Sequence, residues 1–588
     1  MSNLETLRQQ ILDQSPTDQQ REAIFAEELE FLLRAAPGSG KTWTSSRRFI
    51  WRGANWPYSC GGLALLSFTN AAIREFQAAT IEVERRDLLS DPNYVGTFDA
   101  FVERFILTPF GHLPFKATKR PKLLVATRPG DRNNGNLKAW YQSDKGLRPV
   151  PAWEIIPCFL PKKKIGFKAS EDFGGHALQF THKNPVDELM KLGFYTHDQR
   201  VYWASRILKD GPHIAKVIAR RFPEVIVDEA QDTNVWLLYL LDILREQGVK
   251  VTLVGDPDQC IYEFSMANAK WLPALKQKWS IAEKPLSKSF RCNNAIAKAV
   301  RNIGGNEDFS GCGDNVSEYC RPFIIKEPGK TFSRSVTEFE QILNSAGIAK
   351  SSSAIICRGH QQVEDIRGQV TYTHLQGETK KLAQASFVRD CRKDYKKAFK
   401  LVTTSIRVLV EDQDLWDRVD AAPESEEGQR VQLAIWRFVK SDSGLPSVSL
   451  TGTQWISQLR ESLAKIVVEL GAEPVPNLNL KIKKTGLDEK QMRLPLFEAE
   501  MLFPAIRQET IHQVKGESID GVLVIGSSKF WNSVVDAIVK GTTSADSEDR
   551  RLAYVAMTRA RHLLLVALPA SHYDRHVEKW KSWIFMAL

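Results

Sequence analysis

The stretch RAAPGSGKTWT, residues Arg34–Thr44, follows a short apolar run, FLL, and precedes a segment with the pattern of a helix. A phosphate-binding loop needs glycine wherever a backbone N–H must approach a phosphate oxygen closely, because no Cβ can intervene there. Gly38 and Gly40 occupy such positions, and Lys41 would reach the β- and γ-phosphates. Thr42 would ligate Mg²⁺. The strand expected before this stretch and the helix expected after it favour a phosphate-binding loop over a chance glycine-rich turn. The loop alone does not indicate what the nucleotide is used for.

The composition is that of a globular protein with several domains. A chain of 588 residues is too long for one core and predicts about three to four domains. No window of eighteen apolar residues exists, and the N-terminus lacks the features of a secretory signal, so we expect a cytoplasmic protein without membrane contact. The eight cysteines form no C-x-x-C pair, which argues against a zinc ribbon or an iron–sulfur cluster.

The positive charge is concentrated in one segment. The net charge is +10, and residues 111–170 contain 13 Lys and Arg against 3 Asp and Glu, a surplus equal to that of the whole chain. Such a block indicates a polyanionic partner. A solvated, loop-rich insertion is the alternative that charge alone leaves open.

Short apolar runs before turns predict the strands. They are LALLSF (63–68), EVIVDEA (224–230), VTLVGD (251–256), SAIICR (353–358), GVLVIG (521–526) and HLLLVAL (562–568). Continuous apolar strands separated by helical stretches predict parallel sheets covered on both faces. The helix expected after Thr233, NVWLLYLLDIL, is apolar nearly all round, so Trp236 and Tyr239 are interpreted as core residues.

Two long segments interrupt this pattern. One covers residues 105–200 and contains the basic block; the other covers residues 375–505 and contains helical patterns such as QLAIWRFVK and QWISQLRESLAKIVVEL. The expected plan is therefore two α/β cores, each with one insertion.

A second motif, VIVDEAQD, ends an apolar run in two carboxylates. A carboxylate at the C-terminal end of a strand can hold Mg²⁺, and the next one can orient and deprotonate the water that attacks a γ-phosphate. We therefore assign Asp228 to the metal and Glu229 to the role of catalytic base; an N-capping acidic turn is the alternative. Phosphoryl transfer also needs positive charge at the γ-phosphate, for which Arg291 and Arg559 are candidates.

These motifs resemble, in order, those of the UvrD/Rep (PcrA-like) branch of superfamily 1 helicases. They are TDQQREAI (17–24, the Q motif), AAPGSGKT (35–42, motif I), LLSFTNAAIREF (65–76, Ia), GTFDAF (96–101, Ib), VDEAQDTN (227–234, II), VGDPDQCIYEF (254–264, III), LSKSFR (286–291, IV), TIHQVKGESID (510–520, V) and RRLAYVAMTRAR (550–561, VI). The family itself has Ala at the first position of motif I, so Ala35 fits the pattern.

The resemblance implies an α/β fold of two RecA-like parallel-sheet P-loop cores, each with a mainly helical insertion. Residues 1–104 and 200–279 would form core 1A, 105–199 the basic 1B insertion, 280–374 and 506–588 core 2A, and 375–505 a 2B-like insertion.

ATP and Mg²⁺ are the implied cofactors. The implied nucleotide-binding residues are Gln20, Ala36, Pro37, Gly38, Ser39, Gly40, Lys41, Thr42, Trp43, Phe290, Arg291 and Arg559. Gln20 would read adenine, and Phe290 would stack on it. Thr42 and Asp228 would hold the metal.

The implied catalytic residues are Glu229, Lys41, Gln259, Arg291 and Arg559. Gln259 would sense the γ-phosphate and relay its presence to the DNA groove. Arg291 and Arg559 would grip the γ-phosphate from the second core, so that ATP closes the cleft between the cores.

Single-stranded DNA or DNA ends are the implied partners, and the implied activity is ATP-driven 3′-to-5′ movement on a single strand. The implied DNA contacts are Phe68, Asn70, Tyr262, Phe264 and His512. The three aromatic residues would stack on bases, which is tolerant of sequence because every base has a π-face.

Four positions depart from the family pattern. They are Asp99 (usually His, motif Ib), Ser518 (usually Glu, which here is Glu517, one position early), Ser289 (commonly Asn) and Pro257 (frequently acidic). None is among the residues assigned to hydrolysis, so we expect hydrolysis to be retained and the grip on DNA to differ.

A narrower resemblance is to GajB, the helicase-like subunit of Gabija anti-phage defence, which works with an OLD-type ATPase–nuclease. It rests on GTFDAFVERFILTPFGHL and on the VKGES form of motif V. Since 27 residues follow motif VI, we expect a nuclease, if one is involved, to be a second protein. Three functions are weighed: a translocating helicase, an ATPase that senses DNA ends and regulates a nuclease, and a non-hydrolysing scaffold, against which the intact ATP motifs argue.

Overall fold

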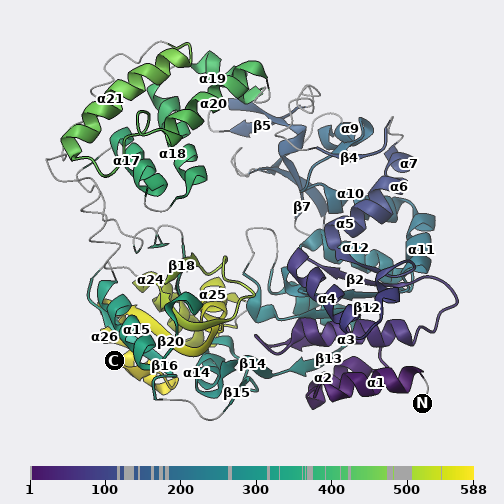
Figure 1. Cartoon of the computed structure of the whole chain (residues 1–588). Helices are drawn as coiled ribbons and strands as arrows, with labels where there is room; N and C mark the ends of the chain where they lie inside the picture. The colour runs from purple at the N-terminus through teal and green to yellow at the C-terminus, as the bar shows by residue number, and fades with distance from the viewer. Residues whose placement is uncertain are drawn as a thin grey trace. The chain divides into compact units, whose positions relative to one another are not determined.

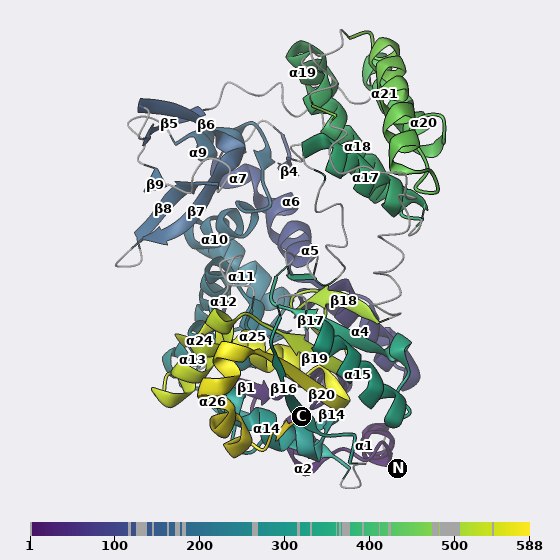
Figure 2. The same ribbon diagram turned by 90° about the vertical axis from the view of Figure 1, so that its left-hand side faces the viewer.

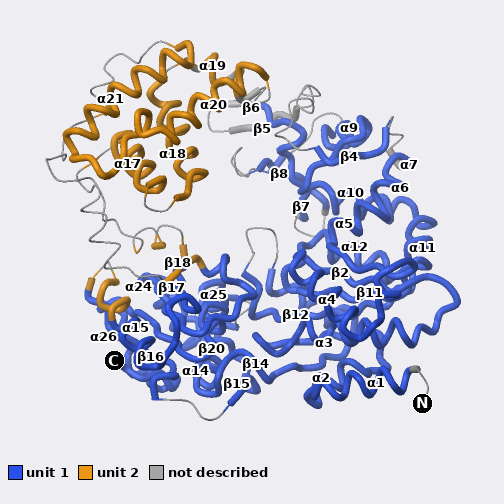
Figure 3. The backbone as a smooth tube through the Cα atoms, in the orientation of Figure 1, with its two compact units in different colours: residues 1–328, 338–358, 511–588 blue, residues 329–337, 359–510 orange. Residues whose placement is uncertain are grey.

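The computed structural model of the chain is drawn in Figure 1. It describes residues 3–115, 119–124, 138–143, 146–160, 164–170, 177–178, 184–261, 268–313, 318–329, 332–359, 362–363, 366, 375, 377–390, 393–410, 412–421, 425–472, 481–482, 506–543 and 546–588. The chain divides into two compact units (Figure 3): unit 1 comprises residues 1–328, 338–358 and 511–588, and unit 2 comprises residues 329–337 and 359–510.

The first sheet of unit 1 is parallel throughout. Its strands, in spatial order, are β13 (Ala282–Leu286), β1 (Phe31–Ala35), β12 (Lys250–Gly255), β11 (Glu224–Val227), β2 (Leu63–Ser67) and β3 (Tyr94–Thr97). The phosphate-binding loop follows β1, and the two carboxylates follow β11. Because parallel strands end at the same edge of a sheet, the fold places both motifs at that edge.

Helices cover both faces of this sheet, as the apolar runs predicted. They are α1 (Asn3–Asp13), α2 (Asp18–Phe25), α3 (Lys41–Ala54), α4 (Asn70–Glu82), α5 (Phe98–Val102), α10 (Arg200–Asp210), α11 (Pro212–Arg221), α12 (Val235–Glu246) and α13 (Trp271–Trp279). Along β1, Leu32 belongs to the cluster with α10–α12, whereas Phe31 and Leu33 belong to the cluster with α1–α4.

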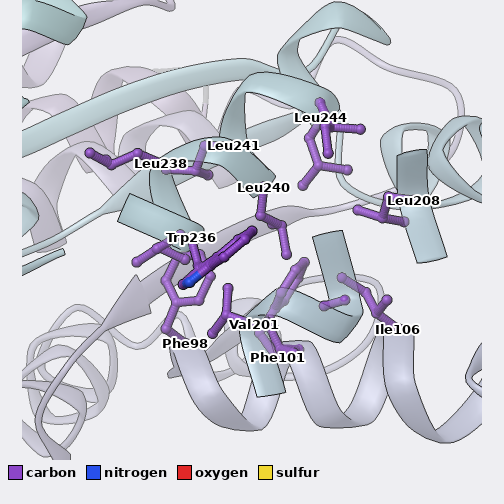
Figure 4. Packing of buried hydrophobic residues seen from close by; sticks show 14 of the residues in the cluster. Phe98, Phe101, Ile106, Val201, Leu208, Trp236, Leu238, Leu240, Leu241 and Leu244 are labelled. Atoms are coloured by element: carbon purple, nitrogen blue, oxygen red, sulfur yellow. The ribbon is translucent and has the colours of Figure 1, made fainter. Parts of the chain in front are cut away.

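The expected core role of α12 is confirmed. Trp236 is buried among Phe98, Phe101 and Leu240 (Figure 4), and its indole N–H donates to the carbonyl of Pro157 at 3.0 Å. Tyr239 packs, partly buried, against the same cluster.

The boundary predicted at residue 279 falls short of the first sheet. β13 pairs with β1 along its whole length, from Phe31 opposite Ala282 to Ala35 opposite Leu286. The sequence AEKPL did not indicate a strand, because it lacks a continuous apolar run. An edge strand tolerates charged residues and proline.

The second parallel sheet of unit 1 lies in the C-terminal half of the chain. Its unit 1 strands are, in order, β17 (Ser353–Cys357), β19 (Ile519–Ile525), β20 (Ala560–Pro569), β16 (Pro322–Glu327) and β21 (Met586–Ala587). The helices beside it are α14 (Asn294–Gly304), α15 (Ser333–Ser345), α24 (Ser528–Val539), α25 (Glu548–Met557) and α26 (Ala570–Ser582), and β14 (Lys288–Asn293) pairs with β15 (Ser310–Cys312). The two-core α/β architecture is thus confirmed.

The first insertion differs from the helical one that we expected. Its described elements are α6 (Thr108–Phe110), α7 (His112–Phe115), β4 (Lys122–Leu123), β5 (Lys138–Ser143), β6 (Gly146–Pro151), β7 (Ile155–Leu160), β8 (Lys164–Ala169), β9 (Ala177–Leu178), α9 (Pro185–Lys191) and β10 (Phe194–Tyr195), and most are strands. Antiparallel pairing joins β5 to β6 and β7 to β8 to β9. Short runs of aromatic and β-branched residues between prolines and glycines favour strands here.

Unit 2 is helical, as predicted for the second insertion. Its helices are α17 (Gly377–Asp390), α18 (Tyr395–Leu409), α19 (Gln413–Ala421), α20 (Glu426–Lys440) and α21 (Gly452–Glu469), which Figures 1 and 2 show gathered in one body; β18 (Arg507–Thr510) also belongs to unit 2. The fully buried Trp455 lies in its core, and its indole N–H donates to Ser386 Oγ at 3.2 Å. Within the described ranges, no helix of either unit has the length and apolar character needed to cross a bilayer.

The core beside the second sheet contains a buried histidine. His572 Nε2 accepts a hydrogen bond from the Trp580 indole N–H at 3.1 Å, and its Nδ1 lies 2.6 Å from Asn532 Oδ1. An indole nitrogen only donates, so the His572 proton must be on Nδ1. Burial, reinforced by His576 and Arg575, lowers the pKa of His572 to about 4.

We therefore predict that acid weakens this core. The folded pKa of His572 lies below that of the unfolded chain, so the unfolded chain takes up the proton first as pH falls through about 6.5. The loss of stability develops between pH 6.5 and 4 and reaches about 3 kcal/mol. The thermal midpoint should fall less between pH 7.5 and 5.0 in His572→Gln than in the wild type. The exposed-site variant His213→Gln should behave as the wild type, and equal falls in all three proteins would contradict the assignment.

Candidate active site

The phosphate-binding loop is built from left-handed glycines and a close strand. Gly38 and Gly40 have φ of 73° and 77°, a region that favours glycine. The Phe290 N–H donates to the Gly38 carbonyl at 2.8 Å, and a Cβ at Gly38 would lie 2.5 Å from the Cβ of Arg291. Gly38 is therefore required both for the loop conformation and for the approach of β14.

Gln20 contacts the phosphate-binding loop through its side-chain amide. Its Nε2 donates to the Ser39 carbonyl at 3.1 Å, and its Oε1 accepts from the Thr17 N–H at 2.9 Å, which closes a capping box at the start of α2. Both ends of the amide are thus bound to the protein in this structure. The predicted adenine contact of Gln20 stays a prediction.

The remaining loop residues line the entry to α3. The Ala36 N–H donates to the Leu286 carbonyl at 2.9 Å, and the Ser39 hydroxyl is buried without a hydrogen-bond partner among the described residues. Thr42 and Trp43 follow in the first turn of α3, where Arg47 lies 4.7 Å above the Trp43 ring. Pro37 precedes Gly38 in the same turn. Phe290 is 49% exposed, and Lys288 Nζ lies 5.7 Å from the centroid of its ring.

An ion pair joins the loop to the end of β11. Lys41 Nζ lies 2.6 Å from Glu229 Oε2, and both side chains are largely buried. Burial opposes the charge of Glu229, but Lys41 and Lys515 outweigh it and lower the pKa of Glu229 to about 2. Burial also opposes the charge of Lys41, yet Glu229 and Asp228 raise its pKa. Each side chain thus keeps the other charged.

Asp228, beside this pair, has no such partner. It is fully buried, and neither carboxylate oxygen has a hydrogen-bond partner among the described residues. Burial, and then the charge of Glu229, raise the pKa of Asp228 to about 7. Buried carboxylates without a partner are costly unless a cation joins them, so Asp228 fits a divalent cation such as Mg²⁺. The metal contact predicted for Thr42 stays a prediction.

A chain of hydrogen bonds leads from Glu229 to the second core. Gln231 Nε2 donates to Glu229 Oε2, and Gln231 Oε1 accepts from the Asp256 N–H at 3.0 Å. Gln259 Nε2 donates to Asp256 Oδ2 at 2.8 Å, and Arg559 Nη2 donates to Gln259 Oε1 at 3.4 Å. Gln259 is thus placed between the two cores.

Two arginines from the second core approach the loop without a carboxylate partner in the part of the chain that is described. Arg291 donates to Ser518 Oγ at 2.8 Å and to carbonyl oxygens, and Arg559 donates to the Val555 carbonyl at 3.0 Å. Burial lowers the pKa of both, in the case of Arg559 to about 9. The negative charge of Glu229 acts in the opposite direction and favours the charged form of both arginines, which raises their pKa. The site therefore brings two positively charged groups close to Glu229.

The sequence reasoning missed several residues of this site. Lys515 Nζ lies 2.7 and 2.6 Å from the two carboxylate oxygens of Asp232, and both side chains are about nine-tenths buried. Both residues lie inside motifs V and II, and Gln231 lies between the motif II carboxylates and Asp232. Membership of motifs II and V was the available sequence signal for these residues. Which residues from opposite cores form an ion pair cannot be predicted without the fold.

Three of the five residues predicted to contact DNA lie in the described part of the chain. The Phe68 ring is stacked on Phe98, with 6.3 Å between centroids, and Asn70 is exposed at the start of α4. His512 Nε2 lies 3.1 Å from the Ile261 carbonyl oxygen. Tyr262 and Phe264 lie outside the described residues.

The departures from the family pattern have visible local partners. Asp99 pairs with the buried Arg200 at 2.7 Å, and Ser289 Oγ accepts from the N–H groups of Arg291 and Cys292 at 3.2 Å each. Pro257 opens a short 3₁₀ turn, Pro257–Gln259, whose Asp258 pairs with Arg34 at 3.0 Å.

Comparison with known proteins agrees with this geometry. The model of the UvrD/REP helicase N-terminal domain matches residues 16–127 and 168–280, and that of the UvrD-like helicase C-terminal domain matches residues 454–570. The chain belongs to the UvrD/Rep helicase family. The likeness to individual relatives of this family is low, so it identifies the family without extending to every property of those proteins.

Three relatives illustrate this. DNA helicase II of Escherichia coli K12 is 22% identical over 94% of this chain and 84% of its own length. The ATP-dependent DNA helicase Rep of Buchnera aphidicola subsp. Schizaphis graminum is 23% identical over 47% of this chain and 42% of its own. The ATP-dependent DNA helicase PcrA of Bacillus subtilis 168 is 23% identical over 48% of this chain and 38% of its own.

The unpaired Asp228 predicts a site that costs stability. Asp228→Asn removes a buried carboxylate that has no hydrogen-bond partner among the described residues, so the nucleotide-free protein should gain about 1–3 kcal/mol and its thermal midpoint should rise. The same variant should lose metal-dependent nucleotide hydrolysis. Asp308→Asn, at an exposed position, should change neither quantity, and a lower midpoint for Asp228→Asn would refute the argument.

Proposed function

We propose that this member of the UvrD/Rep family is an ATP-driven DNA helicase that moves along single-stranded DNA from 3′ to 5′. One observation supports the ATPase part: half-buried Arg291, next to Gly38 of the phosphate-binding loop, and buried Arg559, which donates to Gln259, are each held by neutral acceptors. A partly or fully buried positive charge without an acidic partner among the described residues favours an anionic ligand, and a nucleoside triphosphate fits a loop that ends in Lys41.

The proposed reaction starts from the Lys41–Glu229 pair. The γ-phosphate of ATP competes for Lys41, and the released Glu229 carboxylate orients the attacking water and accepts its proton. Arg291 and Arg559 hold the charge that redistributes over the phosphate oxygens. Mg²⁺, held through Asp228 and Thr42, supplies further neutralisation of the phosphate charge.

The chain Glu229–Gln231–Asp256–Gln259–Arg559 supports coupling between the cores. Loss of the γ-phosphate removes the ligand that both cores share and changes the contacts at each end of this chain. Movement of the cores against each other would then step the protein along DNA. The polarity rests on the family resemblance.

Substitution of the two central charges tests the ATPase. Glu229→Gln should bind ATP and hydrolyse it at least a hundredfold more slowly, because the amide cannot accept the water proton. Arg559→Ala should lower kcat by about 10³-fold, as expected for an arginine that contacts the transferred phosphate. Steady-state hydrolysis with single-stranded DNA measures both. Arg575→Ala, at an exposed position of α26, serves as a matched control, and equal loss there would point to a general effect of charge.

The DNA side is tested at Phe68. Phe68→Ala should weaken single-strand binding by about 1–3 kcal/mol, the worth of one stacked base, and raise the DNA concentration for half-maximal ATPase. The KM for ATP should stay within about twofold. Fluorescence anisotropy of a labelled oligonucleotide, with Phe110→Ala in the first insertion as control, measures this. A raised KM for ATP with unchanged DNA affinity would contradict the role.

A second function is favoured by the divergence of the insertions. The family models leave residues 128–167 and 281–453 unmatched, and these include most of the basic block and of unit 2. The same ATPase would then sense DNA ends and regulate an OLD-type nuclease, as in Gabija-like defence. Hydrolysis by the purified chain, stimulated by single strands and accompanied by unwinding, supports the helicase. Stimulation mainly by blunt ends, or only with an added nuclease, supports the sensor.

A further inference from the structure

The segment Ile511–Ser518, here called the 511–518 segment, contacts both arginines and the first core. The Gly516 carbonyl accepts from Arg291 at 3.2 Å, and the Glu517 carbonyl accepts from Arg559 at 3.5 Å. Lys515 in the same segment forms the buried pair with Asp232. One short segment therefore fixes the surroundings of both guanidinium groups.

Three neutral acceptors hold the Arg291 guanidinium. Nε donates to Ser518 Oγ at 2.8 Å, Nη2 to the Gly516 carbonyl at 3.2 Å, and Nη1 to the Thr558 carbonyl at 3.4 Å. The contact with Ser518 is the shortest, and it is the one made by a side chain. A planar guanidinium bound on three sides has a defined orientation.

The chemistry of these acceptors matters as much as their geometry. A hydroxyl or carbonyl orients an arginine without neutralising it, whereas a carboxylate would form an ion pair and offset the positive charge. Gly516 has φ of +88°, so its carbonyl direction depends on a backbone conformation that other residues rarely adopt. The segment therefore supplies orientation and leaves the charge of Arg291 available to an anion.

We infer that Ser518 is a positioning residue for ATP hydrolysis, whose hydroxyl fixes the Arg291 guanidinium in the orientation that meets the γ-phosphate. The inference rests on the proposed ATPase function. Ser518 acts through Arg291 and does not touch the nucleotide. The competing explanation is that Ser518 only stabilises the local fold of the segment.

Single substitutions give the first test. Ser518→Ala should lower kcat about tenfold and leave the KM for ATP within about twofold, because an unfixed arginine reaches the transition state less often. Ser518→Thr keeps the hydroxyl and should restore most of the activity. Ser528→Ala, at a half-buried serine that is hydrogen-bonded to Ser571, is the matched control.

A double-mutant cycle separates positioning from folding. In an Arg291→Ala background, Ser518→Ala should cause no further loss of kcat, measured by single-turnover hydrolysis, because the group it positions is gone. A further tenfold loss in that background, or wild-type kcat in Ser518→Ala alone, would overturn the inference. Loss of activity in Ser518→Thr as complete as in Ser518→Ala would overturn it too. Absence of hydrolysis by the wild type would instead refute the proposed ATPase.

Discussion

The ion pair between Lys41 and Glu229 links the phosphate-binding loop to the strand end that carries both acidic residues. In a buried site each charge is stable because the other is present, and removing one leaves an uncompensated charge. In the reaction proposed above, an incoming phosphate changes this balance because it offers Lys41 a second anion. Hydrogen bonds connect this pair, through Gln231, Asp256 and Gln259, to Arg559 of the second core.

The site is assembled at the expense of stability. Within the described residues, the Asp228 carboxylate has no hydrogen-bond partner, and Arg291 and Arg559 have neutral acceptors. These three wholly or partly buried ionisable groups are therefore incompletely compensated. Such groups are expected where ligand binding must supply the missing interactions. The apolar clusters on both faces of the first sheet, and the one beside the second, supply the stability that this arrangement requires.

The sequence was informative where one interaction dominates. Apolar runs such as 521–526 and 562–568 became parallel strands because a strand buried on both faces must be apolar throughout. The motif residues Lys41, Glu229, Gln259 and Arg559 belong to one network of hydrogen bonds, and the roles that the family resemblance implies for them stay predictions. β13 was not predicted because an edge strand needs no continuous apolar run. The strands of the first insertion were not predicted because short segments have weak hydrophobic periodicity. Ser518 and Lys515 could not be paired with Arg291 and Asp232 by sequence alone, since 227 and 283 residues separate the partners.

The 511–518 segment also limits how such a protein can diverge. Its residues contact Arg291, Arg559, Asp232 and the chain at Ile261, so one substitution there alters several functions at once. Pleiotropy of this kind is expected to slow change, whereas none of these contacts involves a residue of either insertion. New preferences for DNA form or protein partner are therefore expected to arise by exchange of insertions while the two cores stay unchanged. Protein engineering should follow the same route.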